Sequence, residues 1–250
     1  MIDLSGKRLF VTGGSRGVGR ATALLFARAG ADVALSYHTR REAAESVARD
    51  VEAFGRRAVM VGGDHADAAT VAGMLDAIVA ALGGLDFLVA NAGIWPEPDV
   101  PLARMESARW ADTLRANLDT VFTTTRATIP VLSPGGSIVF VSSTAAQRGE
   151  AFHADYAASK GALVSLTKSL AIECAPTATV NCIAPGWIDT DMAAGVLQGA
   201  YRAQVERAIP LQRIASAADI AGPILFLCSP LARHITGEIL NVNGGSVLCG

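Results

Sequence analysis

The sequence KRLFVTGGSRGVG, residues 7–19, joins a short apolar run to a glycine-rich turn, and a helical pattern follows it as far as Ala29. Gly30 is suited to cap the end of that helix. A strand, a glycine-rich turn and a helix in this order form a phosphate-binding unit, because glycines let backbone N–H groups approach an anion at the positive end of the helix. The turn alone indicates such a site only weakly, since tight packing can also require glycine.

Short apolar runs alternate with helical patterns along the rest of the chain. Strands are predicted at 32–37, 58–61, 85–90, 137–141, 179–184 and 238–242, and helices at 42–54, 71–82, 104–129, 156–174 and 217–227. Continuously apolar strands separated by helices are typical of a parallel sheet that is buried on both faces. We therefore predict an α/β fold, a doubly wound parallel sheet with helices on both faces. Residues 1–250 are expected to form a single domain, in which the less regular residues 187–215 form a lid over the substrate.

The overall composition argues against nucleic-acid and membrane proteins. The net charge is −2, with 51% hydrophobic and 18% charged residues, and this balance indicates no basic surface for nucleic acid or anionic lipid. No apolar run reaches the roughly 18 residues that span a bilayer, and the first residues do not resemble a signal peptide. The four cysteines lack CxxC spacing and the four histidines are scattered, so no metal site is expected. A cytoplasmic protein is predicted.

A second stretch, YAASK at residues 156–160, opens an apolar helix and carries the candidate chemistry. Residues four apart lie on one helix face, so Tyr156 and Lys160 point the same way. A positive charge about 4 Å from a phenol, at an effective dielectric constant of about 20, is worth roughly 4 kcal/mol, which could lower the phenol pKa from ~10 toward ~7. Such a tyrosine is suited to general acid–base catalysis. Ser143, just past a predicted strand, could offer its hydroxyl to a substrate oxygen, although a Tyr–Lys pair at this spacing is usually only a solvated helix edge.

The first turn also permits a different interpretation. Residues 13–17, GGSRG, match the G-x-S-x-G nucleophile elbow of α/β-hydrolases and stand between a predicted strand and a predicted helix. An elbow after the first strand would leave no earlier strand–helix loop to supply the second oxyanion-hole N–H, and Tyr156 and Lys160 would have no role. A serine hydrolase built on Ser15 is therefore the less favoured alternative.

Several short motifs occur in a fixed order along almost the whole chain. They are Thr12-Gly13 with Gly17 and Gly19, Asn91-Ala92-Gly93, Ser143, Tyr156 with Lys160, Pro185-Gly186 and the ending TGEILNVNGG at residues 236–245. Together they resemble the short-chain dehydrogenase/reductase family, in particular its β-ketoacyl-carrier-protein reductases and related ketoreductases. The resemblance implies a Rossmann fold with a seven-stranded parallel sheet, binding of NAD(H) or NADP(H), and reversible hydride transfer between a ketone and a secondary alcohol.

The resemblance also implies roles for four residues. Tyr156 would be the acid in carbonyl reduction and the base in alcohol oxidation. Lys160 would hold the ribose hydroxyls of the nicotinamide half and lower the tyrosine pKa, and Ser143 would hydrogen-bond the substrate oxygen. Asn117, inside the predicted long helix, matches the family position that holds a water leading to Lys160.

The resemblance places the cofactor along one set of residues, namely Gly13, Ser15, Arg16, Gly17, Val18, Gly19, Tyr37, His38, Arg40, Asp64, Asn91, Gly93, Tyr156, Lys160, Pro185, Gly186, Ile188 and Thr190. An NAD-selective site usually has a carboxylate at the end of the second strand. Tyr37 stands at that position instead, while Arg16, Arg40 and Arg41 are able to pair with a 2′-phosphate. We therefore expect NADP(H) to be preferred over NAD(H).

The substrate side is less sharply defined by the sequence. Trp95, His153, Trp187 and Met192 fall where the resemblance places the substrate, and they suggest a partly aromatic pocket for a cyclic or acyl ketone. A homotetramer is expected, with a dimer as the next choice, because two helices of family members pair across a twofold axis. A non-catalytic NADP-binding sensor or subunit on the same fold is a second alternative, but it would have no need for the complete catalytic set.

Overall fold

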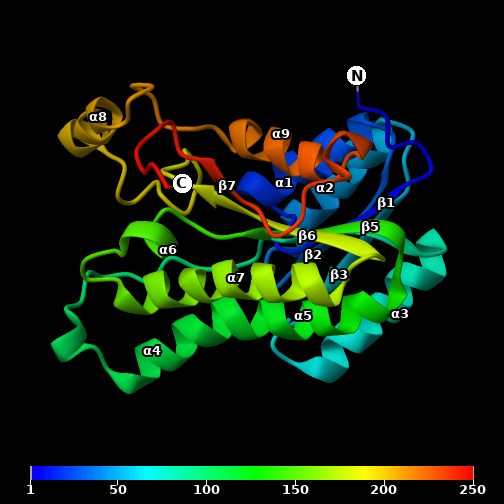
Figure 1. Cartoon of the computed structure of the whole chain (residues 1–250), viewed down its shortest axis with the longest axis horizontal. Coiled ribbons are helices and arrows are strands. Elements are labelled where there is room, and N and C mark those ends of the chain that lie inside the picture. Colours follow the sequence, from blue (N-terminus) through cyan, green and yellow to red (C-terminus); the bar gives the residue numbers. More distant parts are fainter. Residues whose placement is uncertain (1, 250) are drawn as a thin grey trace.

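Residues 2–249, described by the computed structural model, form one parallel sheet of seven strands with helices on both faces (Figure 1). The strand order is β3-β2-β1-β4-β5-β6-β7. The strands are β1 (Arg8–Val11), β2 (Asp32–Tyr37), β3 (Ala58–Gly62), β4 (Leu85–Ala90), β5 (Leu132–Val141), β6 (Ala178–Pro185) and β7 (Ile239–Val242). The sheet confirms the predicted Rossmann-type fold.

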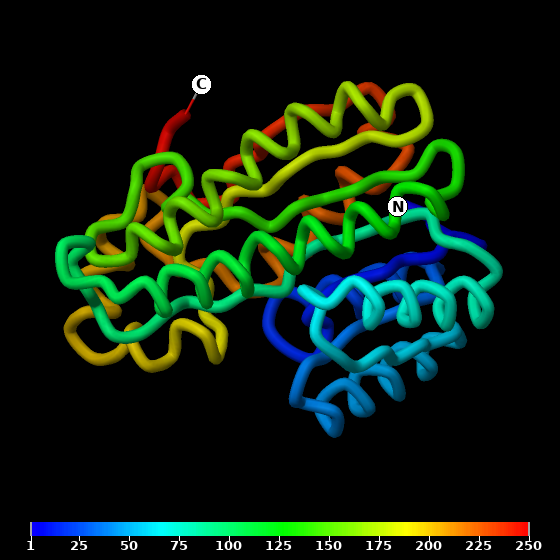
Figure 2. The backbone as a smooth tube through the Cα atoms, turned by 90° about the horizontal axis from the view of Figure 1, so that it is seen from below, coloured from blue at the N-terminus to red at the C-terminus, as the bar shows by residue number. Residues whose placement is uncertain are grey.

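Two layers of helices cover the sheet. α1 (Gly17–Arg28), α2 (Arg41–Ala53) and α9 (Ala217–Leu227) cover one face, and α3 (Ala68–Leu82), α5 (Thr120–Thr128) and α7 (Ala154–Glu173) cover the other. α4 (Ser107–Leu114) precedes α5, and Figure 2 shows this pair running beside α7. Shorter elements are α6 (Ala145–Arg148), α8 (Gly199–Ala208) and 3-10 turns at Leu102–Arg104, Ile129–Val131 and Pro230–Ala232.

The alternation of side chains along the strands builds two cores. Leu9 and Val11 of β1 point to the face covered by α1, α2 and α9, whereas Phe10 between them points to the face covered by α3, α5 and α7. All three side chains are fully buried. Burial of both faces explains why these strands are continuously apolar in the sequence.

The region predicted as one helix over 104–129 is interrupted. α4 ends at Leu114, residues Arg115–Asp119 form a π-helical turn, and α5 begins at Thr120. The wider turn carries the buried Asn117, whose amide pairs with the backbone of Ile94, accepting from the N–H at 2.7 Å and donating to the carbonyl at 3.1 Å. π turns of this kind are frequent at functional sites. Helical periodicity did not predict this turn, and the contact that accompanies it joins residues 23 positions apart in the chain.

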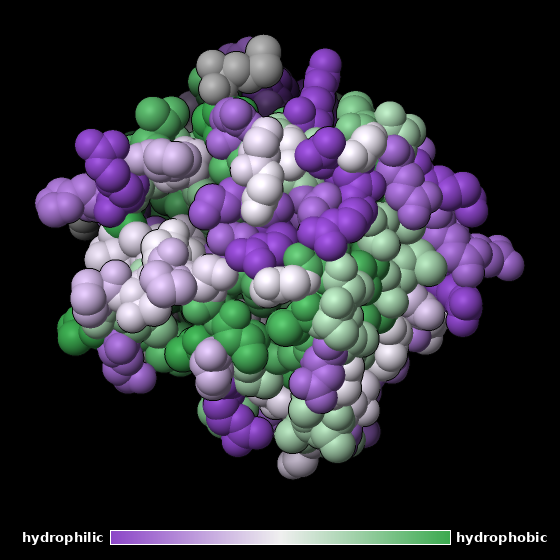
Figure 3. Space-filling model, turned by 90° about the vertical axis from the view of Figure 1, so that its right-hand side faces the viewer, coloured by the Kyte–Doolittle hydropathy of each residue, from purple (hydrophilic) through white to green (hydrophobic). Residues whose placement is uncertain are grey.

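The strand order reverses between β1 and β4. The strands β1 to β3 follow one another toward one edge of the sheet, and β4 to β7 follow one another toward the other edge. Ligands of open α/β sheets bind in the crevice that such a reversal creates at the carboxyl ends of the strands. The segment 187–215, which includes α8, lies at that end (Figure 1). The other end, seen in Figure 3, presents hydrophilic side chains next to hydrophobic ones. No helix within residues 2–249 is long and apolar enough to cross a membrane.

Candidate active site

A cleft of about 500 Å³ opens at the carboxyl ends of the strands. Its walls come from the loops after β1 to β6, from α7 and from residues 187–196. Most of the residues singled out in the sequence line it: Gly13, Ser15, Arg16, Gly17, Val18, Tyr37, His38, Arg40, Asp64, Asn91, Gly93, Trp95, Ser143, Tyr156, Lys160, Pro185, Gly186, Trp187, Ile188, Thr190 and Met192. Gly19, Asn117 and His153 lie outside its lining.

The glycine-rich turn has backbone angles that residues with a Cβ adopt only under strain. Gly13 and Gly17 have φ angles of +64° and +51°, in the left-handed region that favours glycine. Gly19 lies in the first turn of α1, where a Cβ would stand 2.2 Å from the Gly13 carbonyl oxygen. Gly19 therefore packs against the turn rather than lining the cleft, and its predicted contact with the cofactor stays a prediction.

Thr12 and Asn91 join the loops that follow β1 and β4. The Thr12 hydroxyl accepts hydrogen bonds from the backbone N–H groups of Asn91 at 3.0 Å and Ala92 at 2.9 Å. The Asn91 side-chain amide donates to the Thr12 carbonyl at 3.0 Å. These bonds fix the two sides of the crevice at the point where the strand order reverses.

Basic side chains gather at the end of the cleft nearest β2. Arg16 and Arg40 line it, and their guanidinium groups lie 3.7 Å and 3.3 Å from the Asp191 carboxylate. Arg41, the third arginine considered from the sequence, instead pairs with Glu45 at 2.9 Å and does not line the cleft. Arg16 and Arg40 share one carboxylate between them, so the corner keeps a net positive charge that is suited to a phosphate group.

Asp64 is held by neighbours that the sequence did not reveal. Its carboxylate accepts hydrogen bonds from the Ala66 N–H at 2.9 Å and from the Arg115 guanidinium at 2.7 Å. The hydrogen bond from Arg115 lowers the pKa of Asp64 below its usual range. The side chain is therefore an ionised carboxylate at neutral pH, positioned at the cleft wall.

A buried histidine, His65, is linked to the glycine-rich turn through Ser36. His65 Nε2 lies 2.7 Å from the Ser36 hydroxyl, and its Nδ1 lies 2.9 Å from the Thr124 hydroxyl. Ser36 in turn accepts the Gly13 N–H at 3.2 Å. Burial lowers the pKa of His65 to about 4, so the ring is neutral at neutral pH. The single sequence signal for this network was a serine inside an otherwise apolar strand.

Ser143, Tyr156 and Lys160 meet in the cleft because the end of β5 lies next to α7. Tyr156 is 9% exposed and Lys160 is 5% exposed. The Lys160 ammonium donates to the Val141 carbonyl at 2.9 Å and lies 5.9 Å from the centre of the Tyr156 ring. The neighbouring Ser142 hydroxyl donates to the Lys160 carbonyl at 2.8 Å. A hydroxyl, a phenol and an amine thus occupy one part of the cleft wall.

Burial sets the proton affinities of these groups. It raises the pKa of Tyr156 to about 12, against the opposing effect of the Ser143 hydroxyl, and it lowers the pKa of Lys160 to about 8. The prediction that Lys160 lowers the tyrosine pKa toward ~7 is wrong here, because it counted the attraction of the charge and left out the desolvation of both groups. At neutral pH the phenol holds its proton.

Asn117 joins the loop after β4 to α7. Besides its two bonds to Ile94, its amide donates to the Ser159 hydroxyl at 3.2 Å. Gly93 fits between the neighbouring groups, since a Cβ there would lie 2.8 Å from Asn117 Oδ1 and 3.3 Å from Lys160 Nζ. Asn117 thus lies behind the cleft wall rather than in it. The predicted water between Asn117 and Lys160 stays a prediction.

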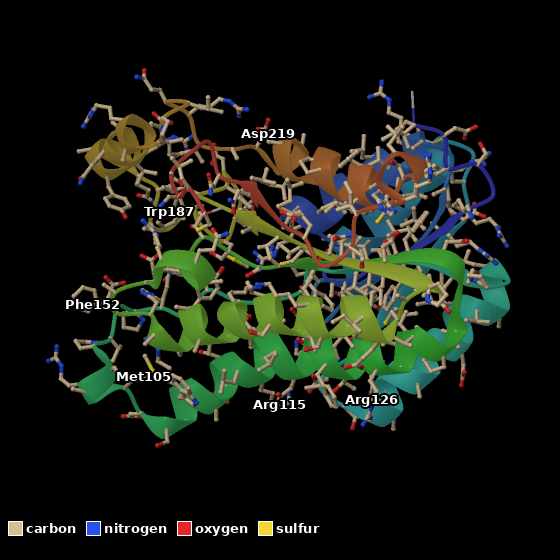
Figure 4. All side chains as sticks on the ribbon, viewed as in Figure 1. Met105, Arg115, Arg126, Phe152, Trp187 and Asp219 are labelled. Carbon is tan, nitrogen blue, oxygen red and sulfur yellow. The ribbon has the colours of Figure 1, made fainter. Side chains whose placement is uncertain are left out.

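Aromatic side chains form the other end of the cleft. Trp95, Trp187 and Met192 line it; the ring centres of the two tryptophans are 6.1 Å apart, and Trp95 meets Tyr156 edge to face at 4.8 Å. Figure 4 shows Trp187 between α8 and α6. His153, predicted to contact substrate, is only 3% exposed and stacks on Trp95 at 4.0 Å. The tryptophan covers the histidine, which therefore does not line the cleft.

A buried ion pair behind the aromatic end is the main feature that the sequence did not predict. Asp155 is fully buried in the first turn of α7, where its carboxylate accepts from Arg109 Nε at 3.0 Å and from the Thr113 hydroxyl at 2.9 Å. Arg109 of α4 also donates to the carbonyls of Pro96 and Pro98. The available signal was one acidic residue near a helix start, where carboxylates are common in any case.

The chain is similar to known proteins over nearly its whole length. The model of a family described as enoyl-(acyl carrier protein) reductase matches residues 13–246. A 3-oxoacyl-[acyl-carrier-protein] reductase FabG of Staphylococcus aureus is 38% identical over 242 residues, which cover 96% of this chain and 97% of the relative. A solved short-chain dehydrogenase/reductase of Brucella melitensis has a TM-score of 0.93 and 36% identity, covering 99% of both chains. A short chain dehydrogenase of Burkholderia cenocepacia in complex with NADP has a TM-score of 0.91 and 39% identity, covering 97% of this chain and 98% of that one.

Proposed function

The chain belongs to the short-chain dehydrogenase/reductase family, and from this premise we propose that Ser143, Tyr156 and Lys160 catalyse its reaction. The protein is an NADPH-dependent oxidoreductase that reduces a ketone to a secondary alcohol. The observation that carries the residue assignment is that the Ser143 hydroxyl, the Tyr156 phenol and the Lys160 amine line one part of the cleft.

The residues of the cleft fit NADPH. The glycine-rich turn at 13–19 leaves backbone groups open at the start of α1, and Gly93 keeps a space beside Lys160 that a Cβ would fill. Arg16 and Arg40 would pair with the 2′-phosphate, which a guanidinium binds through charge-assisted hydrogen bonds. Bound there, NADPH supplies the hydride that reduces the carbonyl carbon.

The three catalytic side chains carry out the proton chemistry. Ser143 donates a hydrogen bond to the carbonyl oxygen of the ketone and holds it beside Tyr156. Tyr156, whose pKa of about 12 keeps the proton on the phenol, donates that proton as negative charge develops on the oxygen. Lys160, whose pKa is about 8, is largely protonated at neutral pH and stabilises the tyrosinate that forms. The Val141 carbonyl holds the amine in place at 2.9 Å.

Replacing the proton donor tests this assignment. Tyr156→Phe keeps the ring and removes the hydroxyl, so ketone reduction should fall by about 10²–10⁴-fold, as is typical for the loss of a general acid. The loss of NADPH absorbance measures turnover, and a titration shows that NADPH still binds. Unchanged turnover would contradict the assignment. Tight NADPH binding without turnover of any ketone would instead favour the non-catalytic sensor.

We further propose that the protein assembles as a homotetramer in the cytoplasm. α5 and α7 run side by side (Figure 2), and they expose Phe122 and Ile172, which are 50% and 81% accessible. A second copy packed along this helix pair would remove these apolar side chains from water. The cysteines are free thiols, which persist in a reducing compartment. A monomeric mass in light scattering would contradict the assembly.

A further inference from the structure

We propose that Trp95 and Trp187 form an aromatic wall that makes the enzyme selective for ketones carrying a flat aryl group next to the carbonyl. The proposal rests on the proposed function, because the wall adjoins Tyr156, the group assigned as proton donor. It goes beyond that function by naming the chemical class of the substrate and the side chains that select it.

The wall is a corner of tilted rings. The planes of Trp95 and Trp187 meet at 55° with their centres 6.1 Å apart, and Tyr201 stands at 87° to Trp187 with its centre 6.4 Å away. A ring inserted between two parallel rings needs about 7 Å, twice the contact distance of carbon atoms. The tryptophans are too close for that, so a substrate ring lies against the corner rather than between its walls.

Trp95 is fixed from behind, so the wall is preorganised. One face of its ring stacks on His153 at 4.0 Å and 25°. The chain that follows Trp95 is tied to α4, because Arg109 donates to the carbonyls of Pro96 and Pro98. The same arginine pairs with Asp155, the residue before Tyr156. The tryptophan and the proton donor therefore share one support, which sets the distance between them.

A rigid aromatic surface favours a rigid aromatic partner. Aromatic rings attract one another in offset and edge-to-face arrangements beyond simple apolar burial, and a flat aryl group loses little rotational freedom when it binds. A flexible acyl chain must instead be ordered at an entropic cost. The remaining lining at this end includes Ile94, Met192 and Val196, which are apolar.

The charges at this end of the cleft point to a neutral substrate. Arg148 and Glu150 line the cleft after Ser143, and they pair with each other at 3.0 Å. Each therefore has a partner of opposite charge already in place. A ketone with a neutral aryl group does not require either of them to be separated from its partner.

The test compares two ketones with eight carbons each, acetophenone and 2-octanone, with acetoacetyl-CoA as a thioester alternative. The parent enzyme should show the higher kcat/KM for acetophenone with NADPH. Trp95→Leu and Trp187→Leu keep apolar bulk but remove the ring, and each should lower the ratio of kcat/KM for acetophenone to that for 2-octanone by about tenfold. Trp95→Phe, which keeps an aromatic ring, should retain much of the parental ratio. A general effect on Tyr156 would change kcat/KM equally for both ketones and leave their ratio unchanged. A change in the ratio therefore reports on substrate selectivity.

Phe54→Leu is the matched control, since Phe54 is exposed at the end of α2 and lies outside the cleft lining. It should leave the ratio unchanged. A parent enzyme that prefers 2-octanone or the thioester, or tryptophan variants with the parental ratio, would overturn the aromatic wall while leaving the reductase assignment intact. Turnover of these compounds that Tyr156→Phe leaves unchanged would instead overturn the proposed role of Tyr156, and with it the premise on which the wall rests.

Discussion

Replacing Arg109 with methionine tests how the fold supports the site. The substitution keeps an unbranched side chain but removes the guanidinium, so it leaves Asp155 fully buried without its cationic partner. Removing one member of a buried ion pair typically destabilises a protein by about 3–5 kcal/mol. In a chain of this size, 1 kcal/mol corresponds to about 2–4 °C, so the melting temperature should fall by about 6–20 °C.

The same change should affect the substrate more than the cofactor. Arg109 holds the carbonyls of Pro96 and Pro98, which follow Trp95 in the chain. Arg109 itself does not line the cleft. When the loop is released, KM for the ketone should rise, while KM for NADPH should stay close to the parental value. A merely structural role would lower the melting temperature without this difference between the two KM values.

Thermal unfolding followed by circular dichroism measures the loss of stability in Arg109→Met, and Arg41→Met serves as the control. Arg41 is 70% exposed and pairs with Glu45, and exposed pairs of this kind contribute little to stability, so the control should melt with the parent. Adding Asp155→Asn to Arg109→Met removes the buried charge and should recover part of the loss. If Arg109→Met melts with the parent and its control, the reasoning about the buried pair is refuted.

Three other changes probe the cofactor side of the cleft. His65 has a pKa of about 4 in the folded state and 6.5 ordinarily, so the unfolded state binds the proton first as the pH falls. The free energy of unfolding should therefore drop by about 3 kcal/mol between pH 6.5 and pH 4, and His65→Gln should flatten this slope in urea unfolding. Gly19→Ala should abolish NADPH binding in a fluorescence titration, because its Cβ would press on the Gly13 carbonyl, whereas Gly73→Ala, with open space around the new Cβ among the described residues, should bind normally. Arg40→Ser should weaken NADPH binding about tenfold and spare NADH; equal losses for both cofactors would count against a 2′-phosphate contact.

Much of the fold was predictable because it follows from repeated local patterns. The strands predicted at 32–37 and 85–90 coincide with β2 and β4, since burial on both faces makes a parallel strand continuously apolar. The single helix predicted over 104–129 was wrong at its centre, where the π turn occurs. In that turn Asn117 pairs with Ile94, a contact between separate segments that no periodicity reports.

The residues of the candidate site divide in the same way, into those that local sequence patterns predict and those that only contacts between distant segments bring together. Residues that lie at strand ends or in ordered motifs, such as Tyr156 and Lys160, could be placed from the sequence because their spacing carries the signal. Arg109 and Asp155 could not, since they are 46 residues apart and meet only after α4 packs on α7. His153 was misplaced for a related reason: its position near Tyr156 was visible, but not the tryptophan that covers it.

The pKa of Tyr156 links the aromatic wall to the pH at which the enzyme can oxidise an alcohol. A phenol with a pKa of about 12 holds its proton at neutral pH and serves as an acid, which reduction requires, whereas oxidation requires the tyrosinate. Trp95 covers the phenol edge to face at 4.8 Å and so contributes to the burial that raises this pKa. Trp95→Leu should admit water and bring the pKa back toward its ordinary value of about 10. The pH profile of alcohol oxidation, measured with NADP and a secondary alcohol, should then begin to rise at lower pH than in the parent. An unshifted profile would mean that the wall selects the substrate without tuning the acid, and that the burial of the phenol comes from α7 and the end of β5 instead.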